Sequence, residues 1–276
     1  MPESPEVEAL ARFLEIEASG REIHDVDVLE FRTVKTRSAP PASIAGRTIT
    51  GAARHGKHVE VVLGDVSLVV SLGRHGWMRW LDAASPDELP ADAPPALATF
   101  ELSGGDGLQV TDAGSWVSLG LFVVRSAGEV PAIAKLGPDP AHPDFRRADF
   151  DAAVGGRRKQ IKAILQEQES LAGIGNAYSD EILHLARVSP VTHAAALNAD
   201  EADRLFDATV TTVRDAITAR RGIPIDQLKA HKVAAMRVHG RTGDACPVCG
   251  DTIRDLTFAG TTAQYCPTCQ NRGAPL

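Results

Sequence analysis

All four cysteines of this 276-residue chain lie within its last 31 residues, and this clustering is the strongest constraint on its fold. They form two Cys-x-x-Cys pairs, Cys246/Cys249 and Cys266/Cys269, separated by sixteen residues. Two pairs at this spacing are typical of a tetrahedral zinc site with four thiolate ligands. Because four protein ligands close the coordination shell, we predict one structural Zn²⁺ ion. A β-hairpin of about 25 residues cannot build a core of its own, so the metal would supply its folding energy. Four free buried thiols are the alternative.

The rest of the composition indicates a globular chain with two domains. Hydrophobic residues make up 43% of the sequence, which is enough for a sizeable core. No apolar run approaches the roughly 20 residues of a membrane helix, and the start, MPESPEVEAL, lacks the features of a signal peptide. We therefore expect a cytoplasmic protein with no membrane partner.

The net charge of −7 is unevenly distributed. Residues 1–150 hold 14 basic and 22 acidic residues (−8), whereas residues 151–276 hold 15 and 14 (+1). Since phosphate binding depends on local basic clusters, the sequence allows a nucleic-acid partner and favours the C-terminal half for its binding.

Local patterns in the first half predict a helix followed by an antiparallel β-sandwich or β-barrel, of which we expect the sandwich. The helix covers residues 4–18, with Ser4 as N-cap and Pro5 as its first residue. Residues 83–96 are rich in Pro, Ala and Asp and are predicted to form a surface loop. The β-rich runs cover residues 23–29, 48–52, 58–63, 67–72, 99–102, 108–111 and 119–124.

The second half has helical periodicity, so the whole chain is predicted to have an α+β fold. Four prolines between positions 131 and 143 mark a linker before it. The helical patterns cover residues 147–155, 158–168, 177–187 and 198–220, and short strands at 252–254 and 262–265 would form the zinc hairpin. The predicted domains are 1–130 (β-sandwich), 131–148 (linker), 149–240 (helical) and 241–276 (zinc-finger hairpin).

The N-terminal sequence contains a candidate nucleophile, Pro2. Removal of Met1 would give Pro2 a free secondary amine. Because α-amino groups have a pKa of roughly 8, part of this amine would be unprotonated near neutrality and could attack an electrophilic sugar carbon. The neighbouring Glu3 could act as an acid or a base. Most terminal prolines have no such role, so other motifs must support this interpretation.

Several segments, in chain order, resemble the formamidopyrimidine-DNA glycosylase / endonuclease VIII family. The resemblance implies a base-excision-repair DNA glycosylase with abasic-site lyase activity, which removes oxidised or ring-opened bases from damaged DNA and acts as a monomer. It also implies a helix–two-turn–helix domain and a terminal zinc finger. The matching segments are PESPEVE (2–8), LGPDP (136–140), LAGIGNAYSDE (171–181), VHGRTGDAC (238–246) and YCPTCQ (265–270).

The resemblance assigns catalytic roles to four residues. Pro2 would form a Schiff base with C1′ of the damaged nucleotide, and Glu3 would protonate the sugar ring oxygen. Glu6 would support the site. Lys57 would contact phosphate and aid strand elimination; the alternative for Lys57 is an ordinary solvated lysine at the start of a strand.

The resemblance also implies which residues contact DNA, since a base must be flipped out of the duplex before it can be excised. Glycines in the helix–two-turn–helix segment would allow a close approach of backbone and DNA. The preceding cations, Arg157, Arg158, Lys159 and Lys162, are interpreted as a phosphate-contacting edge, although a bare charge run is usually a solvated helix face. The predicted DNA-binding residues are Arg74, His75, Trp116, Arg158, Lys162, Gly175, Asn176, Tyr178 and Arg241.

Four departures from the family pattern shape the expected specificity. Arg74 stands where the family has Met, and the loop 112–116 (DAGSW) has no Arg, although Trp116 can serve as a wedge. Thr261 replaces a zinc-finger Arg, and the stretch 221–237 is shorter than in the branch that caps 8-oxoguanine. We therefore expect no strong preference for 8-oxoguanine, relaxed discrimination of the opposite base and weak δ-elimination.

Two other functions fit parts of the sequence. One is a non-catalytic, structure-specific DNA-binding protein on the same scaffold, although the presence of Pro2, Glu3 and Lys57 favours an enzyme. The other is a zinc-ribbon adaptor between proteins, which explains the cysteines but not the first ten residues. Salt-dependent binding to DNA would distinguish the adaptor from the other two.

Overall fold

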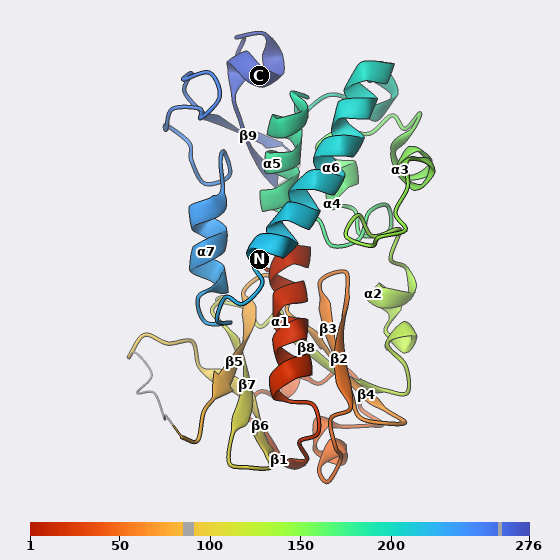
Figure 1. Ribbon diagram of the computed structural model, residues 1–276, viewed down its shortest axis with the longest axis vertical. Coiled ribbons are helices and arrows are strands. Elements are labelled where there is room, and N and C mark those ends of the chain that lie inside the picture. Colours follow the sequence, from red (N-terminus) through yellow and green to blue (C-terminus); the bar gives the residue numbers. More distant parts are fainter. Residues whose placement is uncertain (85–90, 259–260) are drawn as a thin grey trace. The chain divides into compact units, whose positions relative to one another are not determined.

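The computed structural model describes residues 1–84, 91–258 and 261–276. It divides into two compact units (Figure 1). The first consists of Met1–Ala134 together with Arg221–Leu228, and the second consists of Lys135–Arg220 together with Lys229–Leu276. The chain therefore contributes to the first unit twice, before and after the main helical region.

The first unit is an antiparallel β-sandwich with a leading helix, which confirms the predicted fold class. One sheet has the strand order β1-β6-β7-β5 and the other the order β2-β3-β4-β8. Short helices, η1 (Phe31–Thr33), η2 (Pro41–Ile44), η3 (Ala127–Glu129) and α2 (Pro131–Ala134), lie in the connections. The main elements are α1 (Ser4–Glu17), β1 (Ile23–Val28), β2 (Gly51–His55), β3 (His58–Val62), β4 (Ser67–Ser71), β5 (Gly76–Leu81), β6 (Ala96–Leu102), β7 (Gly107–Asp112) and β8 (Gly120–Val124).

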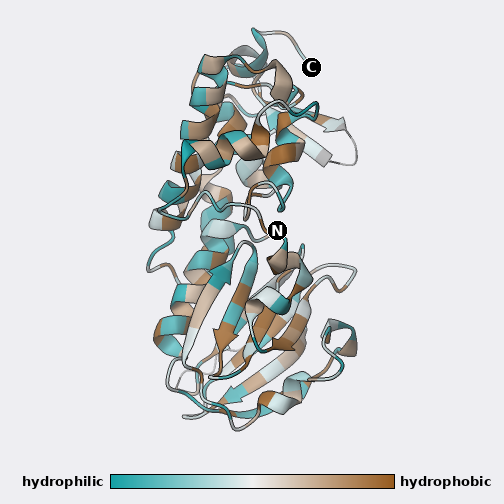
Figure 2. Cartoon of the chain, turned by 90° about the vertical axis from the view of Figure 1, so that its right-hand side faces the viewer, coloured by the Kyte–Doolittle hydropathy of each residue, from teal (hydrophilic) through white to brown (hydrophobic). Residues whose placement is uncertain are grey.

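The core of this unit follows the periodicity of its elements. Val7, Leu10 and Leu14 lie on one face of α1 and are fully buried in the same cluster as the inward side chains of both sheets. Figure 2 shows the resulting bands of apolar and polar residues along the strands.

Three local predictions need correction. The N-cap of α1 is Glu3 and not Ser4, because the carboxylate of Glu6 accepts the Glu3 backbone N–H at 3.2 Å. β2 begins at Gly51, three residues later than expected. β5 has no counterpart among the predicted strands, because its sequence GWMRWL lacks the alternation of apolar and polar residues on which strand prediction depends. The described part of the predicted 83–96 loop excludes residues 85–90.

The second unit is mainly helical and contains the predicted β-hairpin, although the first strand of the hairpin covers Arg254–Phe258 and not residues 252–254. The sequence patterns miss α7 and α8, which are short. The elements are α3 (Arg147–Val154), α4 (Ile161–Gln166), α5 (Asn176–Ala186), η4 (Ala194–Ala196), α6 (Ala199–Ala219), α7 (Leu228–Ala235), β9 (Arg254–Phe258), β10 (Thr261–Tyr265) and α8 (Pro267–Asn271). Of the helices in the described residues, none is long and apolar enough to cross a bilayer.

Candidate active site and nucleic-acid interface

The predicted catalytic residues at the N-terminus lie at the first turn of α1. Pro2 is buried, and Glu3 and Glu6 are each only 1% exposed. The contact between the Glu6 carboxylate and the Glu3 backbone N–H fixes the two residues relative to each other. Glu6 thus has a visible structural role beside its predicted catalytic one.

The turn that carries Lys57 is tied to this end of α1. Lys57 follows Gly56 in the β2–β3 turn, where Gly56 has a positive φ of 56°. The Lys57 Nζ lies 3.9 Å from the Met1 sulfur. The structure therefore brings Lys57 to the N-terminus, although the two are more than fifty positions apart in the sequence.

Arg54 connects the turn that carries Lys57 to the first turns of α1, a role that no sequence motif indicates. Its guanidinium donates to the Glu8 carboxylate at 2.9 Å, to the Ser4 hydroxyl at 3.2 Å and to the Gly56 carbonyl at 3.1 Å. The Arg54 side chain is 7% exposed. Burial raises the pKa of Glu8, but hydrogen bonds from Arg54 and Arg12 outweigh it and lower the pKa overall. Glu8 therefore stays ionised and holds Arg54 in place.

The turn with Arg74 and His75 and the loop with Trp116 lie side by side at one end of the sandwich. Both turn residues are exposed, and the Trp116 side chain is 81% exposed. The Arg74 backbone N–H donates to Ser118 Oγ at 2.9 Å, and the Ala113 N–H donates to the His75 carbonyl at 3.3 Å. The fold thus gathers these three predicted DNA-binding residues into one exposed group.

Asp112 organises the loop beneath Trp116. Its carboxylate accepts the backbone N–H groups of Gly114 and Ser118 and the Ser118 hydroxyl, each at 2.9 Å. Burial raises the pKa of Asp112, whereas these hydrogen bonds lower it by a larger amount. Gly73 has a φ of +57°, and a Cβ at this position would meet Ser118 backbone atoms within about 2.6 Å. The sequence therefore needs glycine where the turn and the loop approach.

The helix–two-turn–helix segment forms a tight loop before α5. Gly173 has a φ of +87°, and its N–H donates to the Gln168 side chain at 2.9 Å. The Gln168 amide group in turn donates to the carbonyls of Gln166 and Ile174. Gly175 is the N-cap of α5, and Asn176 is its first residue. Gln168, which the sequence reasoning does not single out, therefore shapes the loop that presents Gly175 and Asn176.

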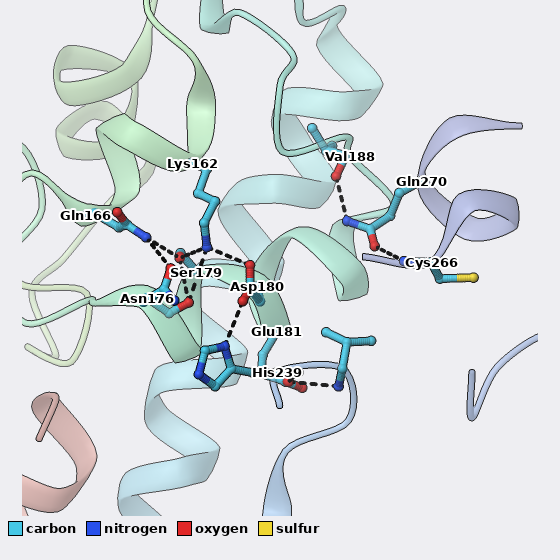
Figure 3. A network of polar contacts seen from close by, with 11 residues as sticks. Lys162, Gln166, Asn176, Ser179, Asp180, Glu181, Val188, His239, Cys266 and Gln270 are labelled. Atoms are coloured by element: carbon cyan, nitrogen blue, oxygen red, sulfur yellow. Dashed lines mark hydrogen bonds and ion pairs between the residues drawn. The ribbon is translucent and has the colours of Figure 1, made fainter. Parts of the chain in front are cut away.

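Lys162 does not belong to a surface edge, which corrects the interpretation of the four cations. Its side chain is fully buried, and its ammonium lies 2.5 Å from Asp180 Oδ1 and 2.9 Å from Ser179 Oγ (Figure 3). A phosphate cannot reach a side chain that has no exposed surface. The other carboxylate oxygen of Asp180 pairs with His239 Nδ1 at 2.7 Å.

The remaining three cations differ in their ion pairs and in their exposure. Arg157 and Lys159 both pair with Glu167, at 2.8 and 2.7 Å, and hydrogen bonds from Lys159 and Ser170 lower the pKa of Glu167 to about 2. Arg158 is exposed, as predicted for a phosphate contact.

Two further predicted DNA-binding residues have local partners. Tyr178 is 2% exposed, and its hydroxyl accepts a hydrogen bond from Arg220 at 3.3 Å. Arg241 is half-buried and lies 3.8 Å from Asp244.

Breaking the Lys162–Asp180 pair is expected to destabilise the second unit strongly. Lys162→Met would leave the fully buried Asp180 carboxylate without its ammonium partner, so we expect a loss of about 3 kcal/mol in the free energy of unfolding. Lys159→Met is the matched control, because Lys159 is 43% exposed and its pair is worth at most about 1 kcal/mol. Urea unfolding monitored by hydrogen exchange in α5 measures both. Equal losses in the two variants would contradict the importance of the buried pair.

The four cysteines fit a zinc ion. Their sulfur atoms all lie within 4.8 Å of one another, with 3.9 Å between Cys246 and Cys269 and 3.3 Å between Cys249 and Cys266. Tetrahedral coordination with Zn–S bonds of about 2.3 Å requires sulfur–sulfur distances of about 3.8 Å. The donor set thus has the composition and the spacing of a structural zinc site, as the sequence predicts.

Residues on α5 and after it hold the zinc-finger region. Gln270 donates to the Val188 carbonyl and accepts the Cys266 N–H, both at 2.9 Å (Figure 3). His184 Nε2 lies 3.3 Å from Cys246 Sγ. Burial, helped by the positive charges of Arg237 and Arg187, lowers the pKa of His184 to about 4, so the ring is neutral at pH 7. Its N–H can then stabilise a thiolate.

Glu181 fixes the chain that leads into the zinc finger. Its carboxylate accepts the backbone N–H groups of Arg237, Val238 and His239, at 2.9 to 3.0 Å. Burial raises the pKa of Glu181 despite these three donors. Together with the pair between Asp180 and His239, this contact makes α5 the support of the segment before Arg241.

Concavity alone does not identify this site. A cavity of about 880 Å³ lies beside β1 and is lined by residues that include Phe31, Lys35 and Arg37. None of the residues predicted for catalysis or DNA binding lines it. The candidate site is defined instead by the chemistry of the residues near the α1 N-terminus and the exposed loops.

Comparison with known proteins gives matches along the whole chain. The formamidopyrimidine-DNA glycosylase N-terminal domain matches residues 1–115, the H2TH domain of the same enzymes matches residues 136–226, and the zinc finger found in FPG and IleRS matches residues 243–272. The three matches follow the order of the β-sandwich, the helical region and the hairpin.

Relatives and solved structures agree with these domain matches. A formamidopyrimidine-DNA glycosylase-like protein of Mycobacterium tuberculosis is 42% identical over 53% of this chain and 91% of its own length. The formamidopyrimidine-DNA glycosylase of Streptococcus pyogenes serotype M3 is 34% identical over 99% of both chains. The Lactococcus lactis enzyme, bound non-covalently to DNA containing an AP site, superimposes with a TM-score of 0.82 at 27% identity, over 98% of this chain and 99% of the other. The protein described here is therefore a member of the formamidopyrimidine-DNA glycosylase family.

Proposed function

We propose that this protein is a base-excision-repair DNA glycosylase that also cleaves the strand at the resulting abasic site. The observation that carries this proposal is the gathering of Pro2, Glu3, Glu6 and Lys57, with Arg54 tying the Lys57 turn to the first turn of α1. A nucleophile, an acid and a cation are thereby available at one place. The solved relatives bound to DNA that contains an abasic site or a damaged base support the same reaction class.

The proposed chemistry begins with Pro2 as the N-terminal residue, after removal of Met1. The secondary amine attacks C1′ of the damaged nucleotide, and the bond from C1′ to the base breaks as the base leaves with a proton. Glu3 protonates the ring oxygen, so that the sugar opens to an iminium ion on Pro2. Loss of a C2′ proton then expels the 3′ phosphate, with Lys57 placed to contact phosphate. Water finally hydrolyses the iminium and frees Pro2.

The DNA contacts of this proposal come from both units. Arg74, His75 and Trp116 supply exposed side chains that can enter the duplex where a nucleotide is extruded. In the second unit, the exposed Arg158 and the half-buried Asn176 are proposed to contact phosphates, whereas Gly175 is buried and shapes the turn that carries Asn176. Lys162 and Tyr178 support this surface from within. We further propose that the protein acts as a monomer on DNA in the bacterial cytoplasm.

The test is strand cleavage of end-labelled duplexes that carry one lesion or one abasic site. Protein whose N-terminal residue is shown by mass spectrometry to be Pro2 should cut both kinds of duplex without alkali. Salt-dependent binding without cleavage would support the non-catalytic DNA-binding alternative and overturn the proposed function. Absence of any salt-dependent binding would leave the zinc-ribbon adaptor.

The same assay tests opposite-base selectivity. The loop with Trp116 lacks an arginine to read the orphaned base, so we expect excision rates opposite the four bases to differ by less than about tenfold. A rate on 8-oxoguanine opposite cytosine more than about tenfold above the rates opposite the other bases would contradict the expected tolerance of the opposite base.

The side chain of Thr261 lies outside the described residues, but the absence of arginine there predicts that β-elimination products exceed δ-elimination products. An excess of δ-elimination products would contradict the expected weak δ-elimination.

A further inference from the structure

An eight-residue segment that follows α6 belongs to the first unit and contributes two side chains to its core. In the segment Arg221–Leu228, Ile225 is 5% exposed and Leu228 is fully buried. Both lie in the same hydrophobic cluster as Trp77 and Met78 of β5. This segment is therefore an integral part of the sandwich, although it lies more than 140 positions beyond β5 in the sequence.

Trp77 makes the polar contact that fixes the segment. Its indole Nε1 donates to the Ile225 carbonyl at 3.0 Å in a buried environment, and the Trp77 side chain is 6% exposed. A buried carbonyl that loses its donor retains its desolvation cost without a compensating bond. The contact therefore depends on a ring N–H at this position, which phenylalanine does not supply.

The position of Trp77 relates this contact to the exposed turn of the candidate site. Trp77 is the second residue of β5 and follows His75 by two positions. On its other side, the turn is fixed to the loop 112–118 through Ser118 and the carbonyl of His75. The Gly76 N–H donates to the Leu72 carbonyl at 2.9 Å and closes the turn, and a Cβ on Gly76 would lie 2.2 Å from that carbonyl oxygen, so this turn requires glycine at position 76. The turn is thus held between two anchors.

We propose that Trp77 is a positioning residue that, through the Ile225 carbonyl, holds Arg74 and His75 in the orientation needed to enter DNA as a damaged nucleotide is extruded. This inference rests on the proposed function. Extrusion of a base breaks its stacking and leaves a hole in the duplex. A turn that is already rigid can fill this hole without first having to become ordered. An abasic site has no base to unstack, so its cleavage depends less on a fixed turn.

Trp77→Phe provides the test, since it keeps an aromatic ring but removes the N–H donor. In single-turnover assays we expect base excision from a duplex to fall about tenfold, and cleavage of an abasic duplex to change by less than about twofold. A 2-aminopurine placed opposite the lesion reports extrusion directly, and its fluorescence rise should slow by the same factor as base excision.

Two further variants separate positioning from stability. Trp80→Phe is the matched control on the same strand: Trp80 packs edge-on against Phe13 at 5.5 Å and has no part in the Ile225 contact. It should lower both activities equally or neither. Trp77→His, whose Nε2 occupies the same ring position as the indole Nε1 and can still donate to the Ile225 carbonyl, should lose less base excision than Trp77→Phe, about two- to threefold, and remains informative if Trp77→Phe does not fold.

The outcomes distinguish a positioning role of Trp77 from a general loss of stability. Equal losses on damaged-base and abasic duplexes in Trp77→Phe, or a selective loss in Trp80→Phe, would overturn the positioning role. If the unchanged protein cleaves neither duplex, the proposed function fails. The 2-aminopurine signal needs no chemistry, so an unaltered extrusion rate in Trp77→Phe would still reject the role of Trp77, and a slowed rate would support it.

Discussion

Protein in which the Pro2 nitrogen is part of a peptide bond is expected to form no covalent adduct with abasic DNA in the presence of borohydride. An amide nitrogen has no available lone pair, whereas the free secondary amine can form an iminium ion that borohydride reduces. A removable N-terminal tag gives the sharpest comparison, because the same chain is assayed before and after Pro2 becomes the first residue. Cleavage of the tag should raise both adduct formation and strand cleavage by about a thousandfold or more.

The control for this experiment addresses DNA binding. The tagged and untagged proteins should bind an uncleavable abasic analogue with affinities within about tenfold of each other, since the phosphate contacts proposed above do not involve Pro2. An adduct of equal yield in the tagged protein would show that another amine forms the imine. Lys57 would then be the first candidate, because its ammonium lies beside the N-terminal residue.

Much of the fold could be predicted from the sequence because local signals agree with the tertiary structure. The cysteine spacing identifies the zinc hairpin, and the β-rich runs at residues 58–63 and 67–72 correspond to β3 and β4. β5 could not be found in this way. Its residues Trp77 and Met78 are both buried, in the same hydrophobic cluster as Ile225 of a segment that is distant in the sequence, and no local pattern contains that information.

The candidate site shows the same division between local and long-range information. Motifs identify Pro2, Glu3 and Asn176, since each belongs to a short recognisable segment. They misplace Lys162, because a cation near a DNA-binding motif looks the same in the sequence whether it faces solvent or a buried aspartate. Arg54 is missed because its partners Ser4 and Glu8 lie in another element, so no local pattern connects them.

Removal of zinc is expected to unfold the hairpin β9–β10 while the helices of the second unit stay folded. The buried cluster around the hairpin consists of Val238, Ile253, Cys246 and Cys266, with Cys269 packed against it. Three of these five side chains are predicted metal ligands, so without the metal the remaining apolar contacts cannot hold the strands. Structural zinc contributes about 10–16 kcal/mol of apparent binding free energy in isolated zinc-finger peptides, which is far more than such a cluster supplies.

Zinc content and hydrogen exchange test this expectation together. Thiol titration of the intact protein should release one zinc ion per chain, and Cys249→Ser should abolish exchange protection in β9 and β10 but preserve it in α5 and α6. Val248→Ser is the matched control, because Val248 lies between the two cysteines of one pair and is 50% exposed. Persistent protection in Cys249→Ser would mean that docking on the segment after α5, through Gln270 and the Val188 carbonyl, suffices to fold the hairpin. Loss of protection in Cys249→Ser alone would establish that the metal, and not this docking contact, provides the folding energy of the C-terminal region.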